Sequence, residues 1–97
     1  MQLSAKPLQN PSVLAREIID GEMVLVNADN ATSLALTNQV AVLIWEKVDG
    51  RNTVQDIIAA LTRQFHNVPV TVESDVLDLL DLLARDGFIG FEWDGRS

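Results

Sequence analysis

The feature that most restricts the fold is a turn dipeptide, Asp20-Gly21, set between two β-prone runs. Val13 to Ile19 reads VLAREII and Glu22 to Val26 reads EMVLV, and both are rich in residues that favour strands. Asp-Gly is typical of a two-residue hairpin turn. Thr32 to Leu36 then alternates between apolar and small or polar residues. Residues 13–36 therefore predict three short antiparallel strands.

The next segment changes to helical signals. Thr37 is predicted to cap a first helix that runs through Asp49 and ends at Gly50. Within it, Val40 to Trp45 reads VAVLIW and is apolar on all sides. A helix of this kind is covered on more than one side, so we expect it to be central.

Two more helices are expected before Gly87. Thr53 to Asp56 resembles a capping box, with Asp in place of Glu, and an apolar stripe at helical spacing follows it. A loop broken by Pro69 separates this helix from a third, predicted over residues 71–86 and ended by Gly87.

The chain of 97 residues is expected to be one α+β domain. Its parts are a loose N-terminal segment (1–12), the antiparallel sheet (13–36), a three-helix part (37–87) and a C-terminal strand or tail (88–97). The order is β-β-β-α-α-α, with a C-terminal strand as an open addition. Phe88 to Trp93 reads FIGFEW. It could close the domain's own sheet, pair with a second copy in a homodimer, or occupy a binding edge.

Charge and composition restrict the partners. The net charge is -7 and the seven basic residues are scattered, so nucleic acid is not an expected partner. The absence of cysteine excludes disulfides and zinc-thiolate sites. No secretory signal or membrane-length apolar run is visible. A soluble, cytoplasmic protein that does not contact the membrane is expected.

Few residues are candidates for catalysis. His66 is the only histidine, which makes a metal site or a triad improbable. Asp75, Asp78 and Asp81 recur every third residue, so a helix splays them apart instead of converging them on a cation. No Gly-rich phosphate loop or nucleophile elbow occurs. We expect no enzymatic activity, no cofactor and no metal.

The third helix has distinct faces at about 100° per residue. Leu79 falls in the arc expected to face the core, together with Val72, Val76, Leu80 and Leu83, whereas the three aspartates and Arg85 fall opposite. Leu82 breaks the pattern, since it falls between Asp75 and Asp78. It is either an ordinary exposed leucine or part of the lining of a groove.

The ordered set of signals resembles the PqqD family. The resemblance rests on the Asp20-Gly21 hairpin, Leu36-Thr37 before a helix containing Ile44-Trp45, Val48-Asp49-Gly50, and Thr53-Val54 before Ile57 and Ile58. It continues through Asp75-Val76, Leu80, Leu83 and Gly87-Phe88-Ile89. Each piece is common by itself, but the order covers Val13 to Ile89.

The resemblance implies a winged helix-turn-helix-like fold and a function. Members of the family, also called RiPP recognition elements, act as peptide chaperones in natural-product pathways such as PQQ biosynthesis. They bind the leader of a ribosomally made precursor peptide and present it to a modifying enzyme, often a radical-SAM protein. The leader adds a strand to the sheet edge beside the third helix. Relatives often carry an aromatic residue and Asn where this chain has Leu34 and Thr37.

Physical reasoning points to the same edge. An edge strand has unpaired amides and carbonyls, and residues 32–36 include no charge or proline to prevent pairing. Apolar and acidic side chains of the third helix would then meet apolar and basic leader residues. The expected peptide-binding residues are Thr32, Ser33, Leu34, Ala35, Leu36, Asp75, Asp78, Leu79 and Leu82.

Two other functions remain open at this point. One is a winged-helix DNA-binding domain, although the third helix has four Asp and one Glu against one Arg. The other is a structural or dimerisation domain without a leader peptide.

Overall fold

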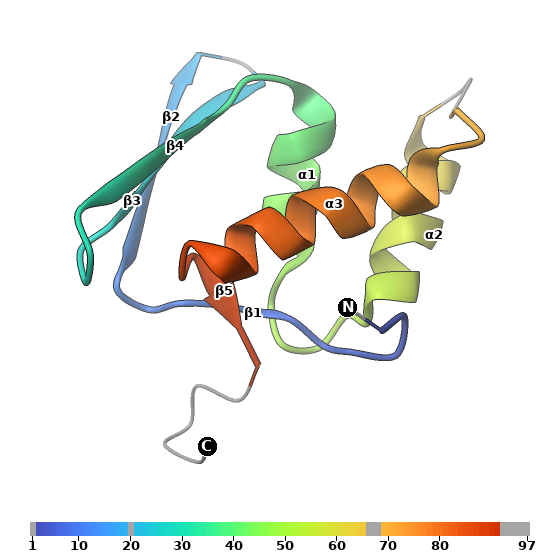
Figure 1. Ribbon diagram of the computed structural model, residues 1–97. Coiled ribbons are helices and arrows are strands. Elements are labelled where there is room, and N and C mark those ends of the chain that lie inside the picture. The colour runs from blue at the N-terminus through green and yellow to red at the C-terminus, as the bar shows by residue number, and fades with distance from the viewer. Residues whose placement is uncertain (1, 20, 66–68, 92–97) are drawn as a thin grey trace.

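The computed structural model describes residues 2–19, 21–65 and 69–91. Figure 1 shows the main sheet on one side of the molecule, with α1 between it and α2 and with α3 crossing in front. No helix in the described ranges is long and apolar enough to cross a membrane. The elements are β1 (Leu8–Gln9), β2 (Val13–Ile19), β3 (Glu22–Asn27), β4 (Thr32–Leu36), α1 (Gln39–Lys47), α2 (Val54–Gln64), α3 (Val72–Arg85) and β5 (Ile89–Gly90).

The three predicted strands form one antiparallel sheet in the order β2-β3-β4. The predicted alternation in β4 is confirmed, because Leu36 is buried and Leu34 packs against the core. Ser33 and Ala35 are exposed on the opposite face. The three-stranded sheet followed by three helices confirms the predicted α+β fold.

Helix α1 begins one residue later than predicted. Its N-cap is Asn38, whose side-chain oxygen accepts a hydrogen bond from Ala41 N at 2.8 Å, and Thr37 is exposed before it. The prediction that Thr37 caps this helix is wrong by one residue, and an asparagine does precede the helix. The helix also ends at Lys47, two residues before Asp49. Its predicted central position is confirmed by buried Val42, Ile44 and Trp45.

The other two helices follow the sequence signals closely. Thr53 and Asp56 form the capping box of α2. Helix α3 buries Val76, Leu80 and Leu83, while Val72 and Leu79 pack at the margin of the core. Gly87, just after α3, has a positive φ of 79°, a conformation that glycine adopts without strain.

The N-terminal segment is not loose, contrary to the prediction for residues 1–12. Strand β1 pairs with β5 in a second, two-stranded sheet. The carbonyls of Leu3 and Ala5 accept hydrogen bonds from Gln55 N and Val54 N, the otherwise unsatisfied amides of the first turn of α2. Sequence periodicity could not show this, because the partners are distant along the chain.

The same pairing accounts for part of the C-terminal segment. Ile89 and Gly90 pair with β1 and not with the main sheet, so they leave both edges of that sheet open. Phe91 is exposed. The rest of the FIGFEW segment, and with it the suggested homodimer pairing, lies outside the described residues.

Two buried asparagines, Asn10 and Asn27, donate hydrogen bonds to the end of α3. Asn27 Nδ2, on β3, donates to the carbonyls of Asp86 and Gly87 at 3.2 and 3.0 Å. Asn10 Nδ2 donates to the same Gly87 carbonyl at 2.9 Å. These bonds fix where α3 lies relative to the strands.

Candidate functional site

Strand β4 is an edge strand, and two of its backbone positions are unpaired within residues 2–19, 21–65 and 69–91. The backbone N–H of Ala28 points toward the β2 side and donates to Ser12 O. The carbonyl of Asn27 points toward the β4 side and accepts from Ala31 N. The direction of the backbone N–H and C=O groups alternates along a strand. The backbone groups of Leu25 and Met23 in β3 therefore also point toward β4. Their partners are Leu34 and Leu36. The N–H and C=O groups of Ser33 and Ala35 therefore point away from the sheet.

The turn before β4 is hydrogen-bonded to the end of α3, and the residues after β4 lead to a pocket that α3 lines. Before β4, Asn30 Nδ2 donates to Asp86 O at the C-terminal end of α3. After β4, Asn38 shares a pocket with Val72 and Val76 from the N-terminal half of α3. The strand and the helix consequently run in opposite directions.

Four α3 residues form a stripe on the side of the helix next to its buried face. Asp75, Asp78, Leu79 and Leu82 are spaced three or four residues apart, so they share one side of the helix. Leu79 packs against the core at its margin, and Leu82 is half-buried. Both aspartates are exposed. The stripe therefore has two partly buried leucines beside two exposed carboxylates.

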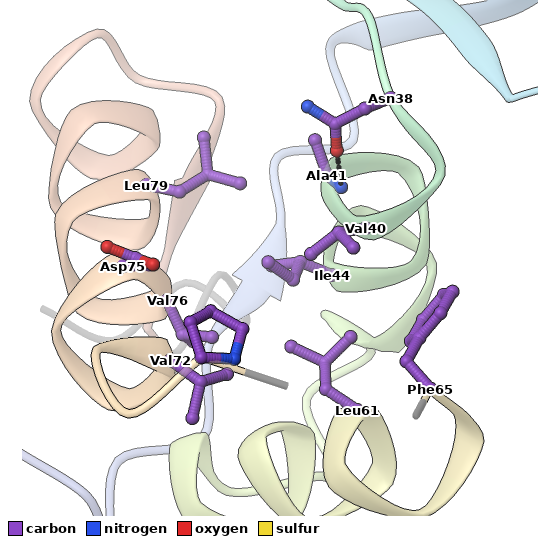
Figure 2. Close-up of a pocket in the computed structure, with 11 residues that line it drawn as sticks. Asn38, Val40, Ala41, Ile44, Leu61, Phe65, Val72, Asp75, Val76 and Leu79 are labelled. Atoms are coloured by element: carbon purple, nitrogen blue, oxygen red, sulfur yellow. Dashed lines mark hydrogen bonds between the residues drawn. The ribbon is translucent and has the colours of Figure 1, made fainter. Parts of the chain in front are cut away.

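A pocket of about 590 Å³ lies between α1, the end of α2 and the N-terminal half of α3. In Figure 2, Leu79 and Val76 of α3 lie across the cavity from Val40 and Ile44 of α1, with Asp75 at its border. Asn38 lies at the cavity where β4 passes into α1. The residues that line the pocket are Asn38, Val40, Ala41, Ile44, Leu61, Phe65, Pro69, Val72, Asp75, Val76 and Leu79.

Comparison with known families identifies the fold. The model of the family described as "Coenzyme PQQ synthesis protein D (PqqD)" matches residues 22–89. The chain belongs to the PqqD family. The PqqD-like domain is, by this membership, of the RiPP recognition element type that the sequence signals indicated.

Solved structures agree on the fold of this PqqD-like domain. "TbiB1 in Complex with the TbiA(beta) Leader Peptide" is 24% identical, with a TM-score of 0.71, over 93% of this chain and 98% of that one. "Lasso peptide synthetase B1 complexed with the leader peptide" is 21% identical, with a TM-score of 0.72, over 89% and 99%. "Structure of the heterocyclase TruD" is 22% identical, with a TM-score of 0.65, over 95% of this chain but 12% of that one. No curated protein matches the sequence.

The residues singled out from the sequence lie on strand β4 and on helix α3. Residues 32–36 form the edge, while Leu79 and Asp75 line the pocket. Asp78 and Leu82 belong to the same helical stripe but do not line the pocket. Thr71 Oγ1 donates to Asp75 Oδ2 at 3.1 Å and so orients this carboxylate at the border of the cavity.

Sequence reasoning missed the wall of the pocket that α1 and α2 contribute. Val40 stays exposed and Ala41 half-buried, although both belong to the apolar VAVLIW stretch. The apolar stretch predicted that α1 is buried on several sides. The spacing of apolar residues does not distinguish a helix side that packs against protein from one that lines a cavity. Phe65, at the end of α2, continues the apolar stripe of that helix, and its spacing predicts only packing in the core.

Other chemistry receives little support from the PqqD-like domain. Across residues 2–19, 21–65 and 69–91, no three His, Cys, Asp or Glu side chains are grouped as a metal site requires. His66 lies outside these ranges. The exposed side of α3 carries Asp75, Asp78 and Asp81, which would repel a phosphate backbone.

Proposed function

We propose that this domain is a non-catalytic module that captures the leader of a ribosomally made precursor peptide and presents it to a modifying enzyme, such as a radical-SAM protein. One observation carries the proposal. The N–H and C=O groups of Ser33 and Ala35 point away from the sheet along the edge strand β4, and the turn before β4 is hydrogen-bonded to the C-terminal end of α3. Two structures of the same fold were solved with leader peptides, which supports this assignment.

The leader would bind as a fourth strand beside β4. An extended peptide can form two main-chain hydrogen bonds with Ser33 and two with Ala35, each contributing roughly 0.5–1.5 kcal/mol. Alternate side chains of the peptide would then point toward α3. Leu79 and Leu82 offer apolar contacts there, and Asp75 and Asp78 attract basic residues.

The pocket extends this edge beyond the end of β4. Asn38 lies two residues after Leu36 and lines the cavity, so a peptide that continues past the paired segment reaches it. Its lining is almost entirely apolar, which suits a bulky aliphatic or aromatic leader residue. Recognition would thus combine sequence-independent main-chain pairing with side-chain selection by α3 and the pocket.

Proline substitution tests the strand addition. Ser33→Pro removes an amide that points away from the sheet, so the ladder with β3 keeps its bonds. Ala15→Pro is the matched control, because Ala15 N–H points away from the sheet at the opposite edge, on β2. The probe is a fluorescent synthetic leader of the precursor encoded beside this gene, titrated by anisotropy.

We expect Ser33→Pro to weaken leader binding at least tenfold, which is about 1.4 kcal/mol. Ala15→Pro should stay within about twofold of the wild type, and circular dichroism should show both variants folded. Equal leader affinity for the wild type and a folded Ser33→Pro variant would refute pairing at β4.

A further inference from the structure

A second, smaller cavity of about 320 Å³ lies on the other side of α1 from the pocket. We call it the acidic cavity, because two carboxylates line it, from Glu17 of β2 and Glu46 of α1. Glu17 pairs with Met23, which packs against the core, so the Glu17 side chain is on the sheet face that α1 covers. The residues that line the acidic cavity are Glu17, Gly21, Gln39, Val42, Leu43, Glu46, Gln64 and Phe65.

Phe65, the C-cap residue of α2, lies where the two cavities adjoin. Val40 and Ile44 of α1 line the pocket, whereas Val42 and Glu46 line the acidic cavity, and these pairs are on opposite sides of the helix at about 100° per residue. Within the described ranges, Phe65 is the one residue that both linings share. In Figure 2 its ring lies on the side of the pocket away from α3. The Phe65 side chain therefore separates the pocket from the two carboxylates.

The part of the pocket next to Phe65 is unsuited to a charge. Its neighbours there are Ile44 and Leu61, which are both buried and apolar. Asp75 lies on the α3 side, at the border of the pocket (Figure 2). A lysine side chain that filled the pocket would bring its ammonium group against apolar side chains, and an unpaired buried charge is costly. The ring of Phe65 attracts a cation, but it satisfies none of the three ammonium donors as a carboxylate would.

We propose that Phe65 determines which leader residue the pocket accepts, by keeping the pocket closed to the acidic cavity. This inference rests on the proposed function. The wild type would then select an uncharged, bulky apolar side chain, while Asp75 binds a basic leader residue at the border. Without the Phe65 ring, the pocket would continue to Glu46 and Glu17, and a long basic side chain would reach a carboxylate.

The test compares leaders that differ in charge at one position. Fluorescent synthetic leaders are made in pairs, with norleucine or lysine at each apolar position in turn, so that both side chains of a pair have an unbranched stem. The Kd of each leader for the full chain is measured by anisotropy. Selectivity is the Kd of the lysine leader divided by the Kd of the norleucine leader. A partial loss of folded protein affects both values equally and leaves this ratio unchanged.

The central variant is Phe65→Ala, and Phe91→Ala is its matched control. Phe91 is exposed and belongs to neither lining. A third variant combines Phe65→Ala with Glu17→Gln and Glu46→Gln, two exposed positions, to remove the carboxylates of the acidic cavity. Phe65→Leu, which keeps an apolar side chain, takes the place of Phe65→Ala if circular dichroism shows that the alanine variant is unfolded.

At one leader position, the wild type and Phe91→Ala should both prefer norleucine by about tenfold or more. Phe65→Ala should lower this selectivity to within about twofold of one, and Phe65→Leu should lower it roughly threefold. Restoring the preference for norleucine is the expected effect of the two glutamine substitutions. Unchanged selectivity at every position in a folded Phe65 variant overturns the inference. A loss of selectivity that persists without the two carboxylates also overturns it, because the acidic cavity is then not the cause.

Failure of the proposed function has a different signature. In that case the wild type binds none of the leaders, and the role of Phe65 falls together with the proposed function. Failure of the inference alone leaves leader binding by the wild type intact, with the same selectivity in the wild type and in the Phe65 variant.

Discussion

The buried amide of Asn27 should be the polar side chain on which the site's geometry depends most. It is 1% exposed. Its Nδ2 donates to Asp86 O and Gly87 O, and its Oδ1 accepts from Asp29 N at 2.9 Å. It therefore joins β3 and the following turn to the end of α3, which sets the spacing between β4 and α3.

The magnitude for Asn27→Ala follows from these three bonds. Each contributes roughly 0.5–1.5 kcal/mol, but both carbonyls keep a second donor, from Asn30 for Asp86 and from Asn10 for Gly87. Because neither carbonyl is left without a donor, we expect Asn27→Ala to lower the free energy of unfolding by about 2 kcal/mol. For a domain of 97 residues this lowers the melting temperature by roughly 8–16 °C.

Asn27→Asp separates hydrogen bonding from packing, because it keeps the shape and replaces the donor with an oxygen. A buried carboxylate would then face two carbonyl oxygens, so its pKa should be raised and its charged form disfavoured. The aspartate variant should be less stable than Asn27→Ala at pH 7 by at least about 1 kcal/mol. Its deficit should shrink toward pH 4, as the carboxyl becomes protonated and can donate.

Urea titration followed by circular dichroism at both pH values measures this. If Asn27→Asp is as stable as Asn27→Ala at pH 7, with no dependence of the difference on pH, the amide does not bind the end of α3 as described.

Two further predictions test local structure. Asn38→Ala should cost about 1 kcal/mol in urea unfolding because it removes the cap of α1, whereas Thr37→Ala should be nearly neutral; the reverse ranking would restore Thr37 as the cap. The backbone N–H of Asn52, which donates to the carboxylate, lowers the pKa of Asp49 below its ordinary value of 3.8. That stabilisation is present above this value and lost as the pH falls through the lowered pKa, so the wild type should lose more stability than Asp49→Asn as the pH falls below 3.8; parallel curves would contradict it.

The sequence alone determined the elements whose signals are local. The hairpin of β2 and β3, the alternation in residues 32–36 and the Thr53–Asp56 capping box each depend on neighbours within a few residues, while Asp20 itself lies outside the described residues. Even the stripe on α3 could be selected from helical spacing. The error at Thr37 is of the same local kind, since two adjacent residues can both cap a helix and only the backbone geometry chooses between them.

The tertiary structure decided everything that joins distant segments. Whether Pro7 to Gln9 is loose depends on β5, and the position of α3 beside β4 depends on Asn10 and Asn27 at the far end of the helix. The pocket exists because three helices meet around an unfilled volume, which no periodicity records. Local backbone preferences are encoded by adjacent residues, whereas a groove is the space left between elements and appears only when the chain packs.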